Sequence, residues 1–201
     1  MFLRRHAFKI AVLALCAAMG IYLLITYVWK PEAALPVLQS APEFEMNDID
    51  GNPVSLSSTN GKVRLVYYYF ANCPDVCPPT TFLLSEAQDK LRAEGKLGSE
   101  AELISITFDP ERDSPDAIRQ FAERTSAELD GWHFLRGDGD ATIELARKMG
   151  VSVVKDPESG TFSHMNLIVL IDKDGQIRQL IKGSDENLDA NYIVNQVNKL
   201  L

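Results

Sequence analysis

The segment that most constrains the fold of this chain is a run of β-branched and aromatic residues at 63–70. Such a run is typical of a central strand that is covered on both faces. Apolar residues at helical spacing follow over 80–94, and residues 103–108 return to a strand pattern. The sequence therefore predicts a β-α-β unit with two parallel strands and a right-handed crossover.

The rest of the chain from about residue 41 continues an α/β pattern. Asp50-Gly51 is a hairpin turn signal, and Ser114-Pro115 is typical of a helix start. The further expected elements are a hairpin over 43–56, helices over 115–124 and 141–149, strands over 167–171 and 176–181 joined by a turn, and a closing helix over 188–200. This order predicts a thioredoxin-like fold, a central mixed sheet flanked by helices, in a domain of residues 41–201.

An apolar segment precedes that domain. No charged residue occurs from 10 to 29, and about 20 apolar residues match the roughly 30 Å of hydrocarbon that a helix must cross. Lys30-Pro31-Glu32 follows in place of a small-residue cleavage site, which favours an uncleaved anchor at 1–30 over a signal peptide. Residues 31–40 are then a linker. Cys16 is expected to be an apolar side chain of the span, since Leu15 before it is larger than a lipidation site requires.

Charge predicts the orientation of the chain in the membrane. Arg4, Arg5 and Lys9 precede the span, so the positive-inside rule keeps the N-terminus in the cytoplasm and puts the domain outside. An arginine- and serine-rich presequence is missing before the span, which favours a single-pass protein of a bacterial cytoplasmic membrane. After residue 30 the chain has 16 basic and 28 acidic residues, a formal charge of −12, and this argues against a nucleic-acid partner.

Two of the three cysteines, Cys73 and Cys77, lie where the central strand gives way to a helix. They are four residues apart, not the three of a thioredoxin C-x-x-C motif, and on a helix this spacing would put both sulfurs on one face. A pair of thiolates prefers copper(I) or zinc. The domain has no second cysteine pair for a closed zinc site, and a plain disulfide remains the main alternative outside the cell.

Five other residues could contribute to the same site or lie near it. His164 precedes a core strand after a turn-rich segment, where a loop could bring it over the carboxyl edge of the sheet. His133 lies between two aromatic residues, and alternation assigns it an ordinary surface role. Asp75 could tune the site, meet a basic partner or help the helix start. Asp109 could orient a ligand, form a hydrogen bond with the loop or serve a turn. Met165 follows His164 and is expected in the core.

Three separated motifs carry a family resemblance. They are Asn-Cys-Pro-Asp-Val-Cys-Pro at 72–78, Asp-Pro-Glu-Arg-Asp-Ser-Pro at 109–115, and His164, which lies six residues before Leu170 and ten before Asp174. Together they resemble the Sco (SenC) family of membrane-anchored copper proteins over about residues 41–201.

The resemblance implies a thioredoxin fold in which Cys73, Cys77 and His164 bind copper, in service of the binuclear copper centre of cytochrome c oxidase subunit II. Tyr69 stands where many members have glycine. Ala71 stands where threonine is frequent, and Val169 where tyrosine is common. These departures concern packing under the cysteine loop more than coordination.

Two functions follow. The first is a copper metallochaperone, not primarily an enzyme, that binds copper at Cys73, Cys77 and His164 and passes it to the oxidase subunit, its own copper donor being unidentified. The alternative is a thiol-disulfide reductase in which Cys73 and Cys77 are the catalytic pair that reduces the subunit's cysteines, with His164 tuning thiolate reactivity. A peroxide-reducing thiol protein fits the fold, but it does not explain twin cysteines with a distant histidine.

Overall fold

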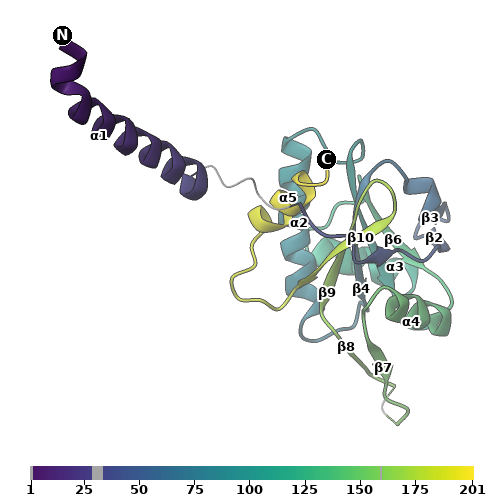
Figure 1. Ribbon diagram of the computed structural model, residues 1–201. Coiled ribbons are helices and arrows are strands. Elements are labelled where there is room, and N and C mark those ends of the chain that lie inside the picture. The colour runs from purple at the N-terminus through teal and green to yellow at the C-terminus, as the bar shows by residue number, and fades with distance from the viewer. Residues whose placement is uncertain (1, 29–33, 159) are drawn as a thin grey trace. The chain divides into compact units, whose positions relative to one another are not determined.

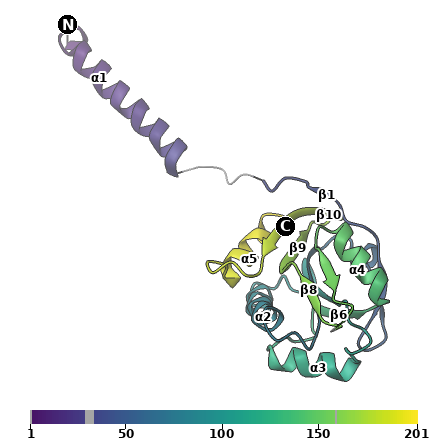
Figure 2. The ribbon, with the colours of Figure 1, turned by 90° about the horizontal axis from the view of Figure 1, so that it is seen from below.

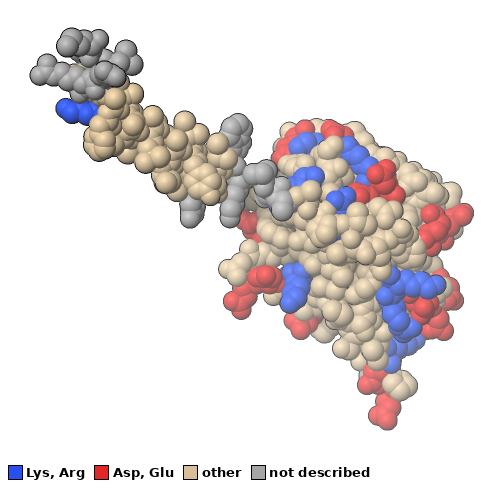
Figure 3. Space-filling view, in the orientation of Figure 1, with Lys and Arg blue, Asp and Glu red and all other residues tan. Residues whose placement is uncertain are grey.

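The computed structural model describes residues 2–28, 34–158 and 160–201, which form two units divided after residue 34. In the first unit, helix α1 (Phe2–Leu23) continues into a short π-helix, η1 (Leu24–Val28). The stretch His6–Thr26 has 21 residues and a mean hydropathy of 2.3, so it is long and apolar enough to cross a membrane. On the face shown in Figure 3 this stretch is uncharged beyond the start of the helix. Trp29 and residues 30–33 of the expected anchor and linker lie outside the described residues.

The second unit, from Leu35 to Leu201, is built on a mixed sheet with the strand order β1-β10-β9-β4-β5-β6-β2-β3. Its strands are β1 (Gln39–Ser40), β2 (Glu45–Asp48), β3 (Pro53–Ser55), β4 (Val63–Tyr69), β5 (Ala101–Thr107), β6 (Trp132–Arg136), β9 (Leu167–Ile171) and β10 (Gln176–Lys182). β4, β5 and β6 run parallel, while β9 is antiparallel to β4. The predicted β-α-β unit and thioredoxin-like fold are confirmed (Figure 1).

Helices cover both faces of this sheet. They are η2 (Ser57–Thr59), α2 (Cys77–Ala93), α3 (Pro115–Arg124), α4 (Gly139–Lys148) and α5 (Ala190–Asn198). Figure 2 shows α2, α3 and α5 around one face and α4 on the other. Every residue of β4 is buried: Tyr69 stacks on Phe121 of α3, and Tyr68 on the other face donates a hydrogen bond to Met149 after α4. Burial on both faces explains the continuous apolar run of this strand.

Local signals set the helix starts. Ser114 caps α3 by accepting a hydrogen bond from the Ala117 amide at 3.2 Å, as the sequence predicts, and Asp138 caps α4 in the same way. α2 begins at Cys77, three residues earlier than expected. Pro78 and Pro79 are tolerated there because the first-turn amides of a helix have no intrahelical partner. The first residue of α2 is therefore itself a candidate ligand.

The two expected hairpins are present, since β2 pairs with β3 and β9 with β10, with left-handed glycines at Gly51 and Gly175 in the turns. A third hairpin was not predicted. It joins β7 (Val153–Lys155) to β8 (Phe162–His164), and among the described strands these two pair only with each other. Residues 39–40, which the sequence assigns to the linker, pair with β10 as strand β1.

Candidate metal centre

The two cysteines lie at the carboxyl end of β4, at the edge of the sheet where α2 begins. Cys73 is in the loop after the strand, and its amide donates to the Phe70 carbonyl at 3.2 Å. Cys77 is the first residue of α2 and is completely buried. Because Cys73 is not helical, the expectation that helical spacing puts both sulfurs on one helix face is wrong. A tight turn before the helix brings them together instead.

His164 ends β8, and the β7–β8 hairpin brings its ring to the cysteines. Its Nε2 lies 3.5 Å from the Cys77 sulfur, and its Nδ1 lies 3.2 Å from the Met165 carbonyl oxygen. A carbonyl can only accept, so this contact favours the tautomer with the hydrogen on Nδ1. The Nε2 lone pair then faces the sulfurs, which is the arrangement that a metal-binding imidazole requires.

The sulfurs of Cys73 and Cys77 and a ring nitrogen of His164 all lie within 4.8 Å of one another. None of the three cysteines of the chain forms a disulfide in the structure. Two sulfurs and one imidazole nitrogen form a soft donor set, which suits copper in either oxidation state and gives zinc one ligand fewer than a closed structural site needs. These three residues could therefore hold a metal ion.

The two sulfurs share one proton. A hydrogen bond from the Cys77 thiol is the main reason that the pKa of Cys73 is lowered to about 4, and contacts from His164 and the amides of Asp75 and Cys77 lower it further, against the opposing effect of burial. The pKa of Cys77 is raised because its proton is held by the Cys73 sulfur and because the thiol is buried. Cys73 is thus the thiolate of the pair at neutral pH.

Aromatic rings form one wall of the site. The His164 ring makes edge contacts with Phe108, at a centroid distance of 5.2 Å, and with Phe70, at 6.2 Å. Phe162 packs on both of these phenylalanines. Beside them lies an open pocket of about 580 Å³, whose lining includes Cys73, Asp75, Arg112, Phe162 and His164. Cys73 and His164 are therefore reachable from the pocket, while the aromatic rings shield the opposite side.

A buried polar network supports the segment after His164. The Tyr67 hydroxyl donates to the Asn166 side-chain oxygen at 3.0 Å, and the Asn166 amide group donates to the Thr80 hydroxyl at 2.9 Å. The Gly183 amide donates to the Asn166 carbonyl. Asn166 is thereby fixed to β4, α2 and the segment after β10.

Asp113 supports the cysteine loop through a hydrogen bond to the backbone just before it. This fully buried carboxylate accepts a hydrogen bond from the Ala71 amide at 2.9 Å and another, very short, from the Thr107 hydroxyl. Burial raises the pKa of Asp113, in opposition to these two bonds. Tyr69 fills the space nearby between Phe121 and Phe134 and contacts neither ligand sulfur by hydrogen bond.

The other candidate residues lie outside the ligand cluster. His133 is on β6, with its Nε2 3.8 Å from a carboxylate oxygen of Glu102. The prediction that Met165 is in the core is wrong, because Met165 is 49% exposed. It follows the β7–β8 hairpin, where its amide donates to the Ser152 carbonyl. Asp75 is exposed on the pocket rim.

Asp109 is buried at the end of β5, and its carboxylate accepts from Arg112 Nε at 2.5 Å. This partnership favours the loop role of Asp109 over direct ligand orientation. Three supporting residues were missed from the sequence, namely Arg112, Asp113 and Asn166. The first two lie within the motif at 109–115, which was the only signal that could have indicated them.

The structure contains a thioredoxin-like domain with a buried Cys-x-x-x-Cys pair and a histidine from a separate hairpin. These features define the class of thiol-containing proteins with a candidate metal site. Comparison with known proteins makes this specific. The SCO1/SenC family model matches residues 33–201. The SCO1 protein homolog of Bacillus subtilis (strain 168) is 33% identical over 164 residues, covering 81% of this chain and 83% of that protein.

Solved structures agree. BsSco, described as a member of the Sco family of cytochrome c oxidase assembly proteins with a disulfide switch, superposes with a TM-score of 0.71 at 30% identity, covering 84% of this chain and 98% of its own. Bradyrhizobium japonicum ScoI with copper bound gives a TM-score of 0.66 at 28% identity, covering 81% of this chain and 99% of its own. The chain belongs to the SCO1/SenC family.

Proposed function

We propose that this protein binds one copper ion through Cys73, Cys77 and His164 and delivers it to cytochrome c oxidase, with subunit II and its binuclear copper centre as the destination. One observation carries the proposal: a loop, a helix and a separate hairpin bring two sulfurs and an imidazole nitrogen within 4.8 Å. The copper-bound relative from Bradyrhizobium japonicum and the oxidase-assembly relative BsSco support the cargo and the acceptor.

The donor set suits a carrier. Copper(I) with two thiolates and a neutral imidazole has a net charge of −1, and copper(II) has a net charge of zero. Neither state leaves an unpaired positive charge near the aromatic wall. Cys73 is ready as a thiolate, whereas Cys77 must release its proton when copper arrives, so copper uptake should release a proton and weaken as the pH falls.

The apolar helix supports an anchored carrier. We propose residues 1–30 as a single-pass anchor in a bacterial cytoplasmic membrane, residues 31–40 as a linker and residues 41–201 as the copper-binding domain on the outer face. Arg4, Arg5 and Lys9 before the span support this orientation through the positive-inside rule. Addition of protease to intact spheroplasts should remove the domain and leave the N-terminus protected.

A transfer experiment tests the proposed function. The full chain in detergent is loaded with one equivalent of copper(I) and mixed with metal-free, reduced subunit II fragment, and copper is measured in each protein after separation. Copper should move to the fragment from the unmodified protein, while the Cys73→Ser variant should fail to retain copper before mixing. Retention of all copper by the donor at excess fragment would contradict a delivery role.

The second candidate is a thiol-disulfide reductase, and the thiolate of Cys73 beside the Cys77 thiol favours it. Cys73 would attack an oxidised cysteine pair of subunit II and form a mixed disulfide. Cys77 would then attack Cys73, giving a Cys73–Cys77 disulfide and two reduced cysteines on the subunit. The first subunit sulfur leaves as a thiolate when Cys73 attacks, and the second takes the Cys77 proton. Two electrons move from one dithiol to one disulfide.

A single-turnover assay separates the two candidates. The copper-free, reduced protein is mixed with oxidised subunit II fragment, and the free thiols of the fragment are counted. The reductase predicts two new thiols per protein consumed, and only one with Cys77→Ser, which stops at the mixed disulfide with the fragment's other cysteine free. An inert mixture would remove the reductase and leave the copper carrier.

A further inference from the structure

The hairpin that carries His164 has little support of its own. β7 and β8 pair with each other through Val153–His164, Val154–Ser163 and Lys155–Phe162, and among the described strands they pair with nothing else. The base of the hairpin is fixed by the Met165 amide bonded to the Ser152 carbonyl. Contacts between the outer part of the hairpin and the rest of the domain therefore decide how firmly the imidazole is held near the sulfurs.

Arg112 provides the most specific of these contacts. Its Nη2 donates to the Gly160 carbonyl at the hairpin tip at 2.8 Å, while its Nε donates to the Asp109 carboxylate at 2.5 Å. Asp109 is 3% exposed, its carbonyl accepts from the Asp113 amide, and its own amide donates to the Thr107 hydroxyl. One guanidinium thus joins a rigid end of the central sheet to a hairpin 48 residues away in sequence.

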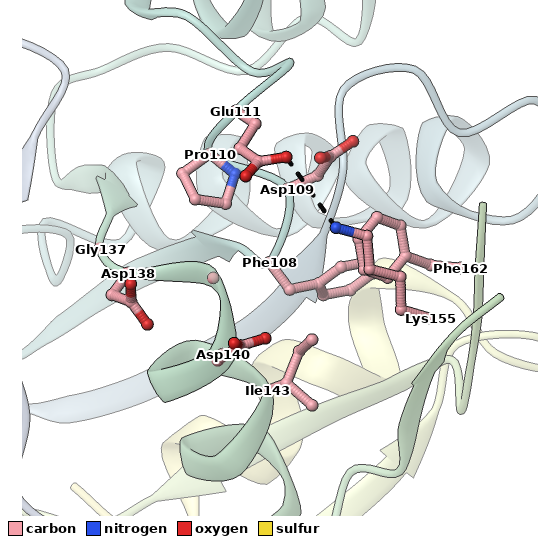
Figure 4. Close-up of a pocket in the computed structure, with 11 residues that line it drawn as sticks. Phe108, Asp109, Pro110, Glu111, Gly137, Asp138, Asp140, Ile143, Lys155 and Phe162 are labelled. Atoms are coloured by element: carbon pink, nitrogen blue, oxygen red, sulfur yellow. Dashed lines mark ion pairs between the residues drawn. The ribbon is translucent and has the colours of Figure 1, made fainter. Parts of the chain in front are cut away.

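The aromatic side chain of Phe162 also attaches the hairpin to the rest of the domain. The Phe162 ring lies against Phe108, at a centroid distance of 4.8 Å, with the Arg112 guanidinium 5.8 Å and the Lys155 ammonium 5.6 Å from its centroid. Figure 4 shows Lys155 crossing beside Phe162 toward Glu111, with an N–O distance of 3.9 Å. Both members of that pair are largely exposed, so it is worth little on its own.

We propose that Arg112 is a positioning residue for the copper(II) state of the centre: by bridging Asp109 and Gly160 it fastens the β7–β8 hairpin and holds the His164 imidazole within reach of Cys73 and Cys77. This inference rests on the proposed copper-binding function. Copper(I) is satisfied by the two thiolates, whereas copper(II) prefers an added imidazole. Loosening the hairpin therefore weakens copper(II) binding selectively.

The positive charge of Arg112 offers a competing explanation. It predicts that removing Arg112 changes copper(II) affinity in the opposite direction from the bridge. Arg112 lines the same pocket as Cys73 and His164, so its positive charge repels a copper cation. Removing that charge should by itself strengthen binding, copper(II) more than copper(I). The bridge predicts weaker copper(II) binding in the same variant. Arg112→Lys keeps the charge but loses the planar fork that reaches two acceptors at once.

Copper affinities of the full chain in detergent, measured against chelators, form the first test. Arg112→Ala and Arg112→Lys should each raise the copper(II) dissociation constant roughly fivefold, as expected for one lost hydrogen bond, and change the copper(I) value by less than about twofold. Arg119→Ala is the matched control, since Arg119 also joins a carbonyl, Ile49, to a carboxylate, Asp50, but on α3 away from the site. It should change neither affinity.

Amide hydrogen exchange of the copper-free protein is the second test. Arg112→Ala should accelerate exchange of the hairpin amides of Asp156, Gly160 and Met165, and leave the amides of β4 and β5 unchanged. Unchanged copper(II) affinity in Arg112→Ala with unchanged hairpin exchange overturns the inference and spares the proposed function. Tighter copper(II) binding in Arg112→Ala, with Arg112→Lys unchanged, replaces the bridge by charge repulsion. Failure of the unmodified protein to bind copper would instead overturn the proposed function.

Discussion

The cysteine loop and the β7–β8 hairpin contribute to the same cluster but are held in different ways. The loop is fixed between β4 and α2, with a fully buried Cys77 and with Asp113 bonded to the Ala71 amide below it. The hairpin pairs only with itself among the described strands and depends on side-chain contacts. The two sulfurs are therefore a fixed part of the core, and in the proposed copper centre the imidazole would be an adjustable third ligand.

This contrast predicts the largest effect at Cys77. Cys77→Ala should weaken copper(I) binding by more than about 100-fold, because it removes one of only two sulfur ligands. Loss of a ligand should cost more affinity than loss of a residue that only supports a ligand, which costs up to about 100-fold. His164→Ala should change copper(I) affinity far less and act mainly on copper(II). Competition titrations with a copper(I) chelator measure both. Equal losses of copper(I) affinity in the two variants would show that the cysteine loop and the β7–β8 hairpin do not differ in their importance for copper(I).

The pH dependence of thiol reactivity sharpens the comparison within the loop. The pKa of Cys73 is lowered to about 4, so its alkylation rate in the copper-free protein should stay nearly level from about pH 8 to about pH 5.5. An ordinary thiol would lose more than about 100-fold over that range. The rate should fall only as the pH drops through the lowered pKa and protonates the thiolate.

Mass spectrometry in a Cys16→Ser background measures this rate site by site. Cys77, whose pKa is raised, should stay unmodified throughout the range. In Cys77→Ala the thiol that donates to Cys73 is gone, so the pKa of Cys73 should return toward its ordinary value. A steep fall in Cys73 alkylation below pH 8 in the parent protein would contradict the shared-proton arrangement.

Asp113→Ala tests how far the loop depends on the core. It leaves the Ala71 amide and the Thr107 hydroxyl without their buried acceptor, which should cost about 2 to 3 kcal/mol of global unfolding free energy. Urea denaturation followed by circular dichroism measures the loss. Asp116→Ala removes an exposed carboxylate on the neighbouring helix and serves as control. The contrast between loop and hairpin would fail if Asp113→Ala loosened only local amides without lowering the global value.

The smallest effect is expected at His133. Its only described ion-pair contact is at 3.8 Å to Glu102, whose carboxylate already bonds Lys62 at 2.8 Å. His133→Ala should therefore change unfolding free energy by no more than about 0.5 kcal/mol and leave copper stoichiometry at its parental value. Loss of copper in this variant would place a second histidine in the metal chemistry.

Much of the fold was predictable because long segments carried consistent patterns. The buried run of β4, the capped start of α3 and the turn between β9 and β10 each combine a strong period with a boundary signal. β7 and β8 have three residues each and pair across a turn-rich segment, so neither offers a measurable period. β1, with two residues, was assigned to the linker for the same reason.

The site was predictable in its ligand types and less so in its support. Cys73 and Cys77 were evident from residue type and spacing, although a turn and not a helix brings their sulfurs together. His164 was a candidate from its position before a core strand, and the family resemblance then implied that it is a ligand. The bridge from Arg112 to Gly160 spans 48 residues and the contact between Tyr67 and Asn166 spans 99. No local pattern encodes such contacts, because they arise only when the sheet and the hairpin pack together.

The proposed function requires that two sulfurs and one imidazole nitrogen, drawn from separate elements, bind the same copper ion. X-ray absorption at the copper edge, on the full chain loaded with one equivalent, tests it most directly. We predict two sulfur ligands in both oxidation states, with one imidazole nitrogen in the copper(II) state that disappears in His164→Ala. A copper(II) spectrum without sulfur ligands, or one identical with and without His164, would contradict copper binding by Cys73, Cys77 and His164.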